Sequence, residues 1–252
     1  MKKRLFGIGG AALLVILVIV GIVIYQSLDD QTEASASAEL EAFRAAAGAA
    51  RDPEPGLPLQ GVYTYSVKGN EAISRGVTVK RDFPATATMV VLHDGDGYST
   101  DIKYSEQHLE MVRYVLEDEG TFLTFAKTTV SAGPITSVRD RTWTPRLLRF
   151  PAAGASQKSW GGTYKAGALD LQVKASEKPS ESVTVGDATV QANVYEFVQD
   201  VTGEYSGDRT EVFWVDPKTS LVVRYTIESR LRGPVNIDFF ADQTLDSLTP
   251  QT

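Results

Sequence analysis

The stretch VFWVDPKTSLVVRY, residues 212–225, carries apolar alternation on both sides of a short polar segment. Asp216 suits the first position of a type I turn, and Pro217 fixes φ at the second. Side chains that alternate with a period of two are typical of antiparallel strands with one buried and one solvated face. The stretch therefore predicts a β-hairpin, in which the acid, the proline and Lys218 serve the turn and not catalysis.

The same period recurs along the chain, and turn-forming residues separate the alternating runs. No long helical pattern follows residue 60. The sequence predicts an all-β, mainly antiparallel fold of about ten strands linked by hairpins. Such a meander curls into a barrel, a half-barrel or a sandwich, and we expect a strongly curved sheet that forms a half-barrel or an open barrel. The clearest runs are GVYTYSV (61–67), YSTDIKY (98–104), LDLQV (169–173) and LVVRYTIESR (221–230).

Residues 131–167 are less regular, because they contain three prolines and many glycines. Proline cannot donate to a sheet ladder. We therefore expect a long crossing between two halves of the sheet, with short strands at 146–150 and 160–165.

An uncharged, mostly apolar run of 21 residues extends from Leu5 to Tyr25. About 20 apolar residues cross the ~30 Å hydrocarbon layer of a bilayer. Basic residues occupy positions 2–4, and the positive-inside tendency places that side in the cytoplasm. We predict a cytoplasmic tip at 1–4, a transmembrane signal anchor at 5–25 that contacts the membrane lipid bilayer, and an extracytoplasmic domain in the cell envelope.

Cleavage of this segment as a signal peptide is the alternative. Ala-Ser-Ala sequences end at Ala36 and at Ala38. Signal peptides normally have a shorter apolar region of about 7–15 residues, with the cleavage site close behind it. The length of the run favours an uncleaved anchor, whereas cleavage near Ala36 or Ala38 would release a secreted domain.

A juxtamembrane linker is predicted at 26–60, and its alanine and glutamate content indicates a short helix at 37–47. The proline-rich residues 51–58 cannot continue that helix. The segment is either a stalk that lifts the domain off the membrane or a helix that packs against the sheet. The β domain then occupies 61–245, and 246–252 form a C-terminal tail.

The charge and the absence of cysteine exclude several function classes. The whole chain carries a net charge of −7, and the part after residue 30 carries −8. An acidic domain is a poor match for nucleic acid, whose binding depends on phosphate neutralisation. Without cysteine there are no disulfides, no thiolate metal sites and no lipid-modified cysteine.

The stretch HDGDGYSTD, residues 93–101, combines acids and glycines as calcium loops do. The twelfth position of a helix–loop–helix calcium loop is a glutamate, but here it is Ser105. Because Asp-Gly between alternating strands is a strong hairpin signal, we interpret the stretch as a turn. We predict no metal ligand and no cofactor.

Catalytic motifs are missing from the sequence. The two histidines, His93 and His108, belong to no nucleophile elbow, no HExxH motif and no phosphate loop. We therefore predict no catalytic residue and a non-enzymatic protein. A hydrolase that uses a pair of carboxylates is the remaining enzymatic alternative.

A basic segment, RDRTWTPRLLR at 139–149, is the candidate binding patch. Bidentate arginine contacts suit anionic lipid headgroups or an anionic envelope polymer. In an acidic domain the alternative is a solvated loop whose arginines pair with the surplus acids. The candidate residues are Arg139, Arg141, Trp143, Arg146 and Arg149.

Two longer stretches, LLRFPAAGASQKSWGGTY (147–164) and VTVGDATVQANVYEFVQDVTGEYSGDRTEVFWVDPKTSLVVRYTIES (183–229), are similar to a known group. The order of a proline-ended strand, a tryptophan, a hairpin and an Asp-Pro-Lys-Thr turn resembles the bacterial lipoprotein-carrier superfamily, which includes the LolA and LolB proteins and the LppX and LprG group. The glycine that usually follows this turn is Ser220 here.

The resemblance implies a curved antiparallel sheet whose concave side is covered by helices and encloses an apolar cavity for acyl chains. We therefore expect a membrane-anchored binding domain that holds a lipid or other apolar ligand. The alternative is a structural or protein-interaction module with a filled core, whose partner is an envelope protein or polymer.

Overall fold

Alternating residues build thirteen strands in the computed structural model, which describes residues 31–46, 56–132 and 135–252. Every strand is antiparallel to its neighbours. The strands are β1 (Gly61–Arg75), β2 (Val77–Asp82), β3 (Thr86–Asp94), β4 (Gly97–Ser105), β5 (His108–Glu117), β6 (Gly120–Ala132), β7 (Ile135–Pro151), β8 (Ser159–Ala166), β9 (Leu169–Val185), β10 (Ala188–Gly203), β11 (Ser206–Val215), β12 (Val222–Arg232) and β13 (Asn236–Leu245). The predicted all-β antiparallel class is therefore confirmed.

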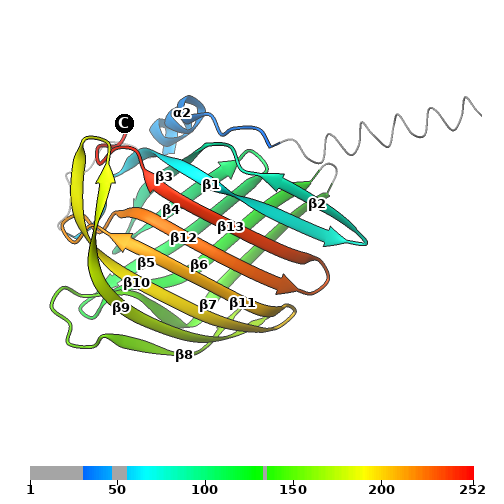
Figure 1. Cartoon of the computed structure of the whole chain (residues 1–252). Helices are drawn as coiled ribbons and strands as arrows, with labels where there is room; N and C mark the ends of the chain where they lie inside the picture. The colour runs from blue at the N-terminus through cyan, green and yellow to red at the C-terminus, as the bar shows by residue number, and fades with distance from the viewer. Residues whose placement is uncertain (1–30, 47–55, 133–134) are drawn as a thin grey trace, which may run out of the picture.

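Twelve of the strands form a closed barrel, since β13 pairs with β1 (Figure 1). The opposite edge of β1 is shared: residues 61–66 pair with β3, and residues 70–75 pair with β2. From β3 to β13 each strand pairs with the next strand along the chain, as a meander should.

The half-barrel, open-barrel and sandwich expectations are corrected by this closure. The β1–β13 ladder joins residues 65–74 to 236–245 over ten pairs. Closure satisfies the backbone groups that an open sheet would expose along both edges, so it favours the barrel over the half-barrel.

The prediction for the proline-containing residues 131–167 is also corrected. Instead of a long crossing, residues 135–151 form the strand β7, which pairs with β6. The ladder accommodates Pro145 because β7 pairs with β8 only at Trp143 and Thr144, so no donor is needed at residue 145 on that side. The expected short strands at 146–150 and 160–165 fall within β7 and β8.

A short helix, α2 (Ala36–Ala46), packs on the outer wall of β1 and β3 (Figure 1). Phe43 is buried there against Val62 and Val90. Of the two alternatives for this segment, the packed helix is therefore the observed one, and it lies outside the barrel. The helices that the resemblance implies on a concave face are not found among the described residues.

No helix within residues 31–46, 56–132 and 135–252 is both long and apolar enough to cross a membrane. The predicted anchor, 5–25, lies outside these residues.

The two ends of the barrel differ. At the end where β1 begins, Leu57 and Leu221 are buried, and the Tyr65 hydroxyl donates to the Val222 carbonyl oxygen at 2.7 Å across the interior. Tyr65, Leu221 and Val222 also line a cavity in the barrel interior. At the other end, where β7 begins and β12 ends, a hollow of about 370 Å³ lies between the strand ends.

Candidate functional site

The barrel encloses a cavity of about 100 Å³. This cavity adjoins the hollow at the strand ends, because Arg141, Ala166, Leu169 and Leu231 line both. A buried water needs roughly 10–15 Å³ of such space, so the cavity has room for several waters or a small polar group. Its wall is mostly apolar, and its largest group of connected polar side chains surrounds one carboxylate.

That group is the Glu211 cluster, which comprises Glu211, Arg149, Arg209, Gln199 and Tyr225. The Glu211 carboxylate, 2% exposed, accepts from Arg149 Nη2 at 2.8 Å and Arg209 Nη2 at 2.9 Å. The Tyr225 hydroxyl donates to it at 2.6 Å and Gln199 Nε2 at 2.5 Å. Four donors thus converge on one buried carboxylate.

Arg149 is held in place by aromatic rings as well as by charge. Its guanidinium carbon lies 4.4 Å from the ring centre of Phe197 and 4.2 Å from that of Phe213. Stacking on aromatic faces suits the planar guanidinium, whose charge is attracted by the ring quadrupole. The side chain is therefore fixed in direction, although only one of its nitrogens reaches a carboxylate.

The charges of the cluster support one another. Burial alone would raise the pKa of the Glu211 carboxyl, but Arg149 and Arg209 hold it well below its ordinary value. Burial would lower the pKa of Arg209, and Glu211 instead raises it. Both ions are consequently charged at neutral pH, even though they lie inside the barrel.

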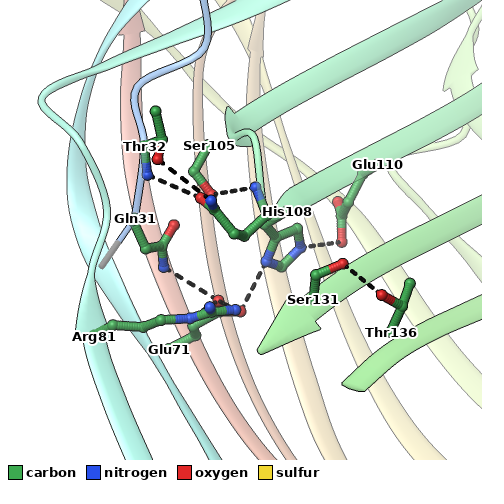
Figure 2. A network of polar contacts seen from close by, with 10 residues as sticks. Gln31, Thr32, Glu71, Arg81, Ser105, His108, Glu110, Ser131 and Thr136 are labelled. Atoms are coloured by element: carbon green, nitrogen blue, oxygen red, sulfur yellow. Dashed lines mark hydrogen bonds and ion pairs between the residues drawn. The ribbon is translucent and has the colours of Figure 1, made fainter. Parts of the chain in front are cut away.

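A second charged group, the His108 cluster, lies near the opening (Figure 2). It comprises His108, Glu71, Arg81 and Glu110. His108 Nδ1 donates to Glu71 Oε2 at 2.8 Å, and Nε2 lies 3.9 Å from Glu110 Oε1. Arg81 Nε donates to the other Glu71 oxygen at 2.8 Å. Two cations and two acids therefore alternate, in the order Arg81, Glu71, His108 and Glu110.

Both ring nitrogens of His108 face carboxylates, and this decides its protonation. Burial would lower the pKa of the imidazole, but Glu71 and Glu110 outweigh it and raise the pKa to about 9. A histidine that is protonated at neutral pH, with Nδ1 bonded to Glu71 and Nε2 facing Glu110, cannot act as a general base. The arrangement is thus a structural ion chain, unlike the serine–histidine–acid geometry of hydrolases.

Strand alternation divides the basic segment predicted from the sequence. Arg139, Arg141, Trp143 and Arg149 belong to the inner side of β7, because each lines the cavity or the hollow. Arg146 lies outside, where it pairs with Glu117 and covers the Phe122 ring at 5.5 Å. The segment is therefore a strand and not the solvated loop that was the alternative.

The four inner members of that segment do not form one patch. At the opening, Arg139 stacks on Tyr205 at 4.3 Å and lies 3.3 Å from a Glu204 carboxylate oxygen. Arg141, two residues further along the same face of β7, donates to Thr128 Oγ1 at 3.0 Å. Trp143 is buried, and Arg149 joins the Glu211 cluster.

Sequence reasoning missed Arg209, Glu211 and Glu110 as interior residues. A signal was available, because Arg209 and Glu211 share a strand face with the buried Phe213. Charges on the apolar face of an alternating strand are rarely tolerated unless paired, so they mark an interior polar site.

The interpretation of residues 93–97 as a turn is confirmed. Asp94 and Gly97 pair at the β3–β4 hairpin, and Gly95 has φ +63°. Among the described residues there is no group of three acidic or histidine side chains that could hold a metal ion.

No protein-family model matches the chain, and no curated protein matches its sequence significantly.

Proposed function

We propose that this chain is a single-pass, membrane-anchored binding protein whose extracytoplasmic barrel holds an amphipathic ligand. The observation that carries the proposal is the cavity and the adjoining hollow, of about 100 and 370 Å³. Ligand sites are typically mostly apolar pockets of roughly 300–1,000 Å³ with a few convergent polar groups. The combined space reaches that range of volume, and its walls combine apolar side chains with polar groups, among them the Glu211 cluster.

The ligand enters, in this proposal, between the strand ends where β7 begins. At the opposite end Leu57 and Leu221 are buried, and the Tyr65 hydroxyl contact with Val222 crosses the interior. A lipid-like ligand also agrees with the similarity of 147–164 and 183–229 to the lipoprotein carriers and with the predicted anchor at 5–25, which would keep the barrel close to its membrane source.

The experiment that tests this function is native mass spectrometry of the full chain, purified in a nonionic detergent from its own host. We expect a mass increment of one small amphiphile that is released on activation in the gas phase. A clean ligand-free mass, together with no uptake of added fatty acid or fatty alcohol, would count against it.

The second candidate is a structural or interaction module with a filled core. It is favoured by the small size of the inner cavity, which alone is below the range of ligand pockets. This module would bind none of the added amphiphiles, and its partner would be an envelope protein or polymer. The same measurement therefore separates the two functions.

A further inference from the structure

Within the described residues, the inner side of the barrel carries more positive than negative charge. Four cationic side chains line the cavity with two acidic ones, although the part of the chain after residue 30 has a net charge of −8. The cationic residues are Lys127, Arg141, Arg149 and Arg209, and the acidic residues are Glu110 and Glu211. Uncompensated buried charge is costly, so an excess of this kind favours the binding of an anion.

The excess is confined to one side of the interior. In the His108 cluster two cations face two acids. Around the cavity, Arg149 and Arg209 share the single carboxylate of Glu211. Arg141 lines the same cavity and has no carboxylate oxygen of the described residues within 4.0 Å. Lys127 lines the cavity too, and so does Glu110 of the His108 cluster, so four cationic side chains meet two acidic ones there.

Arg149 supplies unused donors at the cavity. Only 5% of this residue is exposed, yet its Nε and Nη1 atoms have no hydrogen-bond partner among the described residues. The Nε atom of Arg209 is in the same state. Buried polar groups in proteins are almost always paired, so these N–H groups are available to an acceptor that occupies the cavity.

We propose that these donors, together with the positive charge of Arg141 on the same cavity wall, bind the carboxylate of an amphipathic anion, of the fatty-acid class, whose chain extends through the hollow. This inference rests on the proposed binding function and adds the identity of the headgroup. Each free N–H group of Arg149 and Arg209 can donate one charge-assisted hydrogen bond to a carboxylate oxygen. Leu169 and Leu231, which line both spaces, supply the apolar path from the headgroup to the opening.

The test compares three probes that share a ten-carbon chain and differ in headgroup: decanoate, 1-decanol and decylamine. The full chain in a nonionic detergent is incubated with each at equal concentration at pH 7.5, and uptake is measured by native mass spectrometry. We expect decanoate to be taken up at least about tenfold more than decanol, and decylamine not at all; one charge-assisted hydrogen bond in a buried site supports such a ratio.

The failures are distinguishable. Equal uptake of decanoate and decanol would overturn the headgroup assignment and leave the binding function standing. Preferential uptake of decylamine would overturn it too. Uptake of none of the three would overturn the headgroup assignment and the proposed function together.

A matched pair of variants on one strand locates the site. Arg141→Gln removes an inward guanidinium that pairs with no carboxylate, so the fold is expected to survive. Arg146→Gln removes an outward guanidinium from the same strand. We expect Arg141→Gln to lower decanoate uptake about tenfold with decanol uptake unchanged, and Arg146→Gln to change neither.

Arg141→Lys, which keeps the charge, should restore part of the preference for decanoate. Circular dichroism melting of each variant verifies that it is folded, and the lysine variant provides the result if the glutamine variant does not fold. An unchanged ratio of decanoate to decanol uptake in folded Arg141→Gln would overturn the proposed site.

Discussion

The Glu211 cluster and the His108 cluster are both buried ion groups inside the same barrel, but they differ in how their charges are matched. In the His108 cluster two cations alternate with two acids, and each charged end faces an opposite charge within 4.0 Å. In the Glu211 cluster two arginines share one carboxylate and keep N–H groups without partners beside a cavity.

The two clusters show how a ligand-binding site differs from a structural ion network. Burial and ion pairing are common to both clusters, so neither feature alone marks a binding site. Only the Glu211 cluster combines surplus donors, surplus charge and space. We therefore assign ligand recognition to the Glu211 cluster and structural stability to the His108 cluster.

The largest expected effect comes from removing the carboxylate at the centre of the Glu211 cluster. Glu211→Gln leaves Arg149 and Arg209 buried without their counter-ion, and breaking a buried pair on one side costs about 3–5 kcal/mol. Urea unfolding measures the change. The control is Glu228→Gln, which removes an exposed partner of Arg230 and should cost less than about 1 kcal/mol. Equal losses in the two variants would contradict the assigned role of Glu211.

The next effect is a pH dependence that belongs to the His108 cluster. The folded protein raises the pKa of His108 to about 9, while an unfolded histidine has a pKa near 6.5. A raised pKa contributes stability that is complete below about pH 6.5 and is lost as the pH rises through 9; a shift of this size corresponds to about 3 kcal/mol.

Unfolding free energies at pH 6, 7.5 and 9.5 check this dependence. We expect a decline toward alkaline pH in the parent chain and a much smaller decline in His108→Gln. His93→Gln is the control, because His93 contacts the Pro58 carbonyl oxygen and no carboxylate of the described residues. Glu211 raises the pKa of Arg209 above its ordinary value, so Arg209 stays charged over this range. An alkaline decline that survives His108→Gln would contradict the assignment of the pH dependence to the His108 cluster.

A smaller change in stability, opposite in sign to that of Glu211→Gln, is expected when Arg141 is replaced. Burial, and next to it the charge of Arg209, lowers the pKa of Arg141 to about 10, so its charged form is less favoured there than in water. Arg141→Gln should therefore leave the ligand-free stability unchanged or raise it by about 1 kcal/mol, as functional residues often permit. Thermal unfolding of ligand-free protein measures this. A clear loss of stability would mean that Arg141 is structural.

The smallest change in stability is expected at Ser220, which belongs to neither cluster. Ser220 follows the Asp216–Thr219 turn and has φ +57°, a conformation that favours glycine. Ser220→Gly relieves this strain but increases the entropy of the unfolded chain, so we expect a gain of no more than about 1 kcal/mol. Urea unfolding checks the gain. A loss above 1 kcal/mol would contradict the strain argument.

The local part of the fold was predictable from the sequence. Alternation gave the antiparallel strands, and Asp216 with Pro217 gave the turn, in which the Asp216 carboxylate accepts from the Lys218 backbone N–H and the Thr219 hydroxyl. These features depend on neighbouring residues, so a short window of sequence contains the information. The structure also explains Ser220, because its φ of +57° lies in the region that favours glycine.

The non-local part was not predictable in the same way. Closure depends on the pairing of β1 with β13, about 170 residues apart in the chain. The Glu211 cluster combines residues from four strands, and its acid and arginines resemble surface charges until their strand face is known. The basic segment at 139–149 was identified, but its division by β7 into inner residues and Arg146 required the register.

The central claim is that the Glu211 side of the barrel binds the carboxylate of an amphipathic anion. A crystal structure of the full chain with 10-bromodecanoate tests it most directly, because bromine is located by its anomalous scattering. We predict carboxylate density in contact with Arg149 and a bromine peak in the hollow near Leu231. A bromine peak only on the outer surface, or an empty cavity at saturating ligand, would contradict the claim.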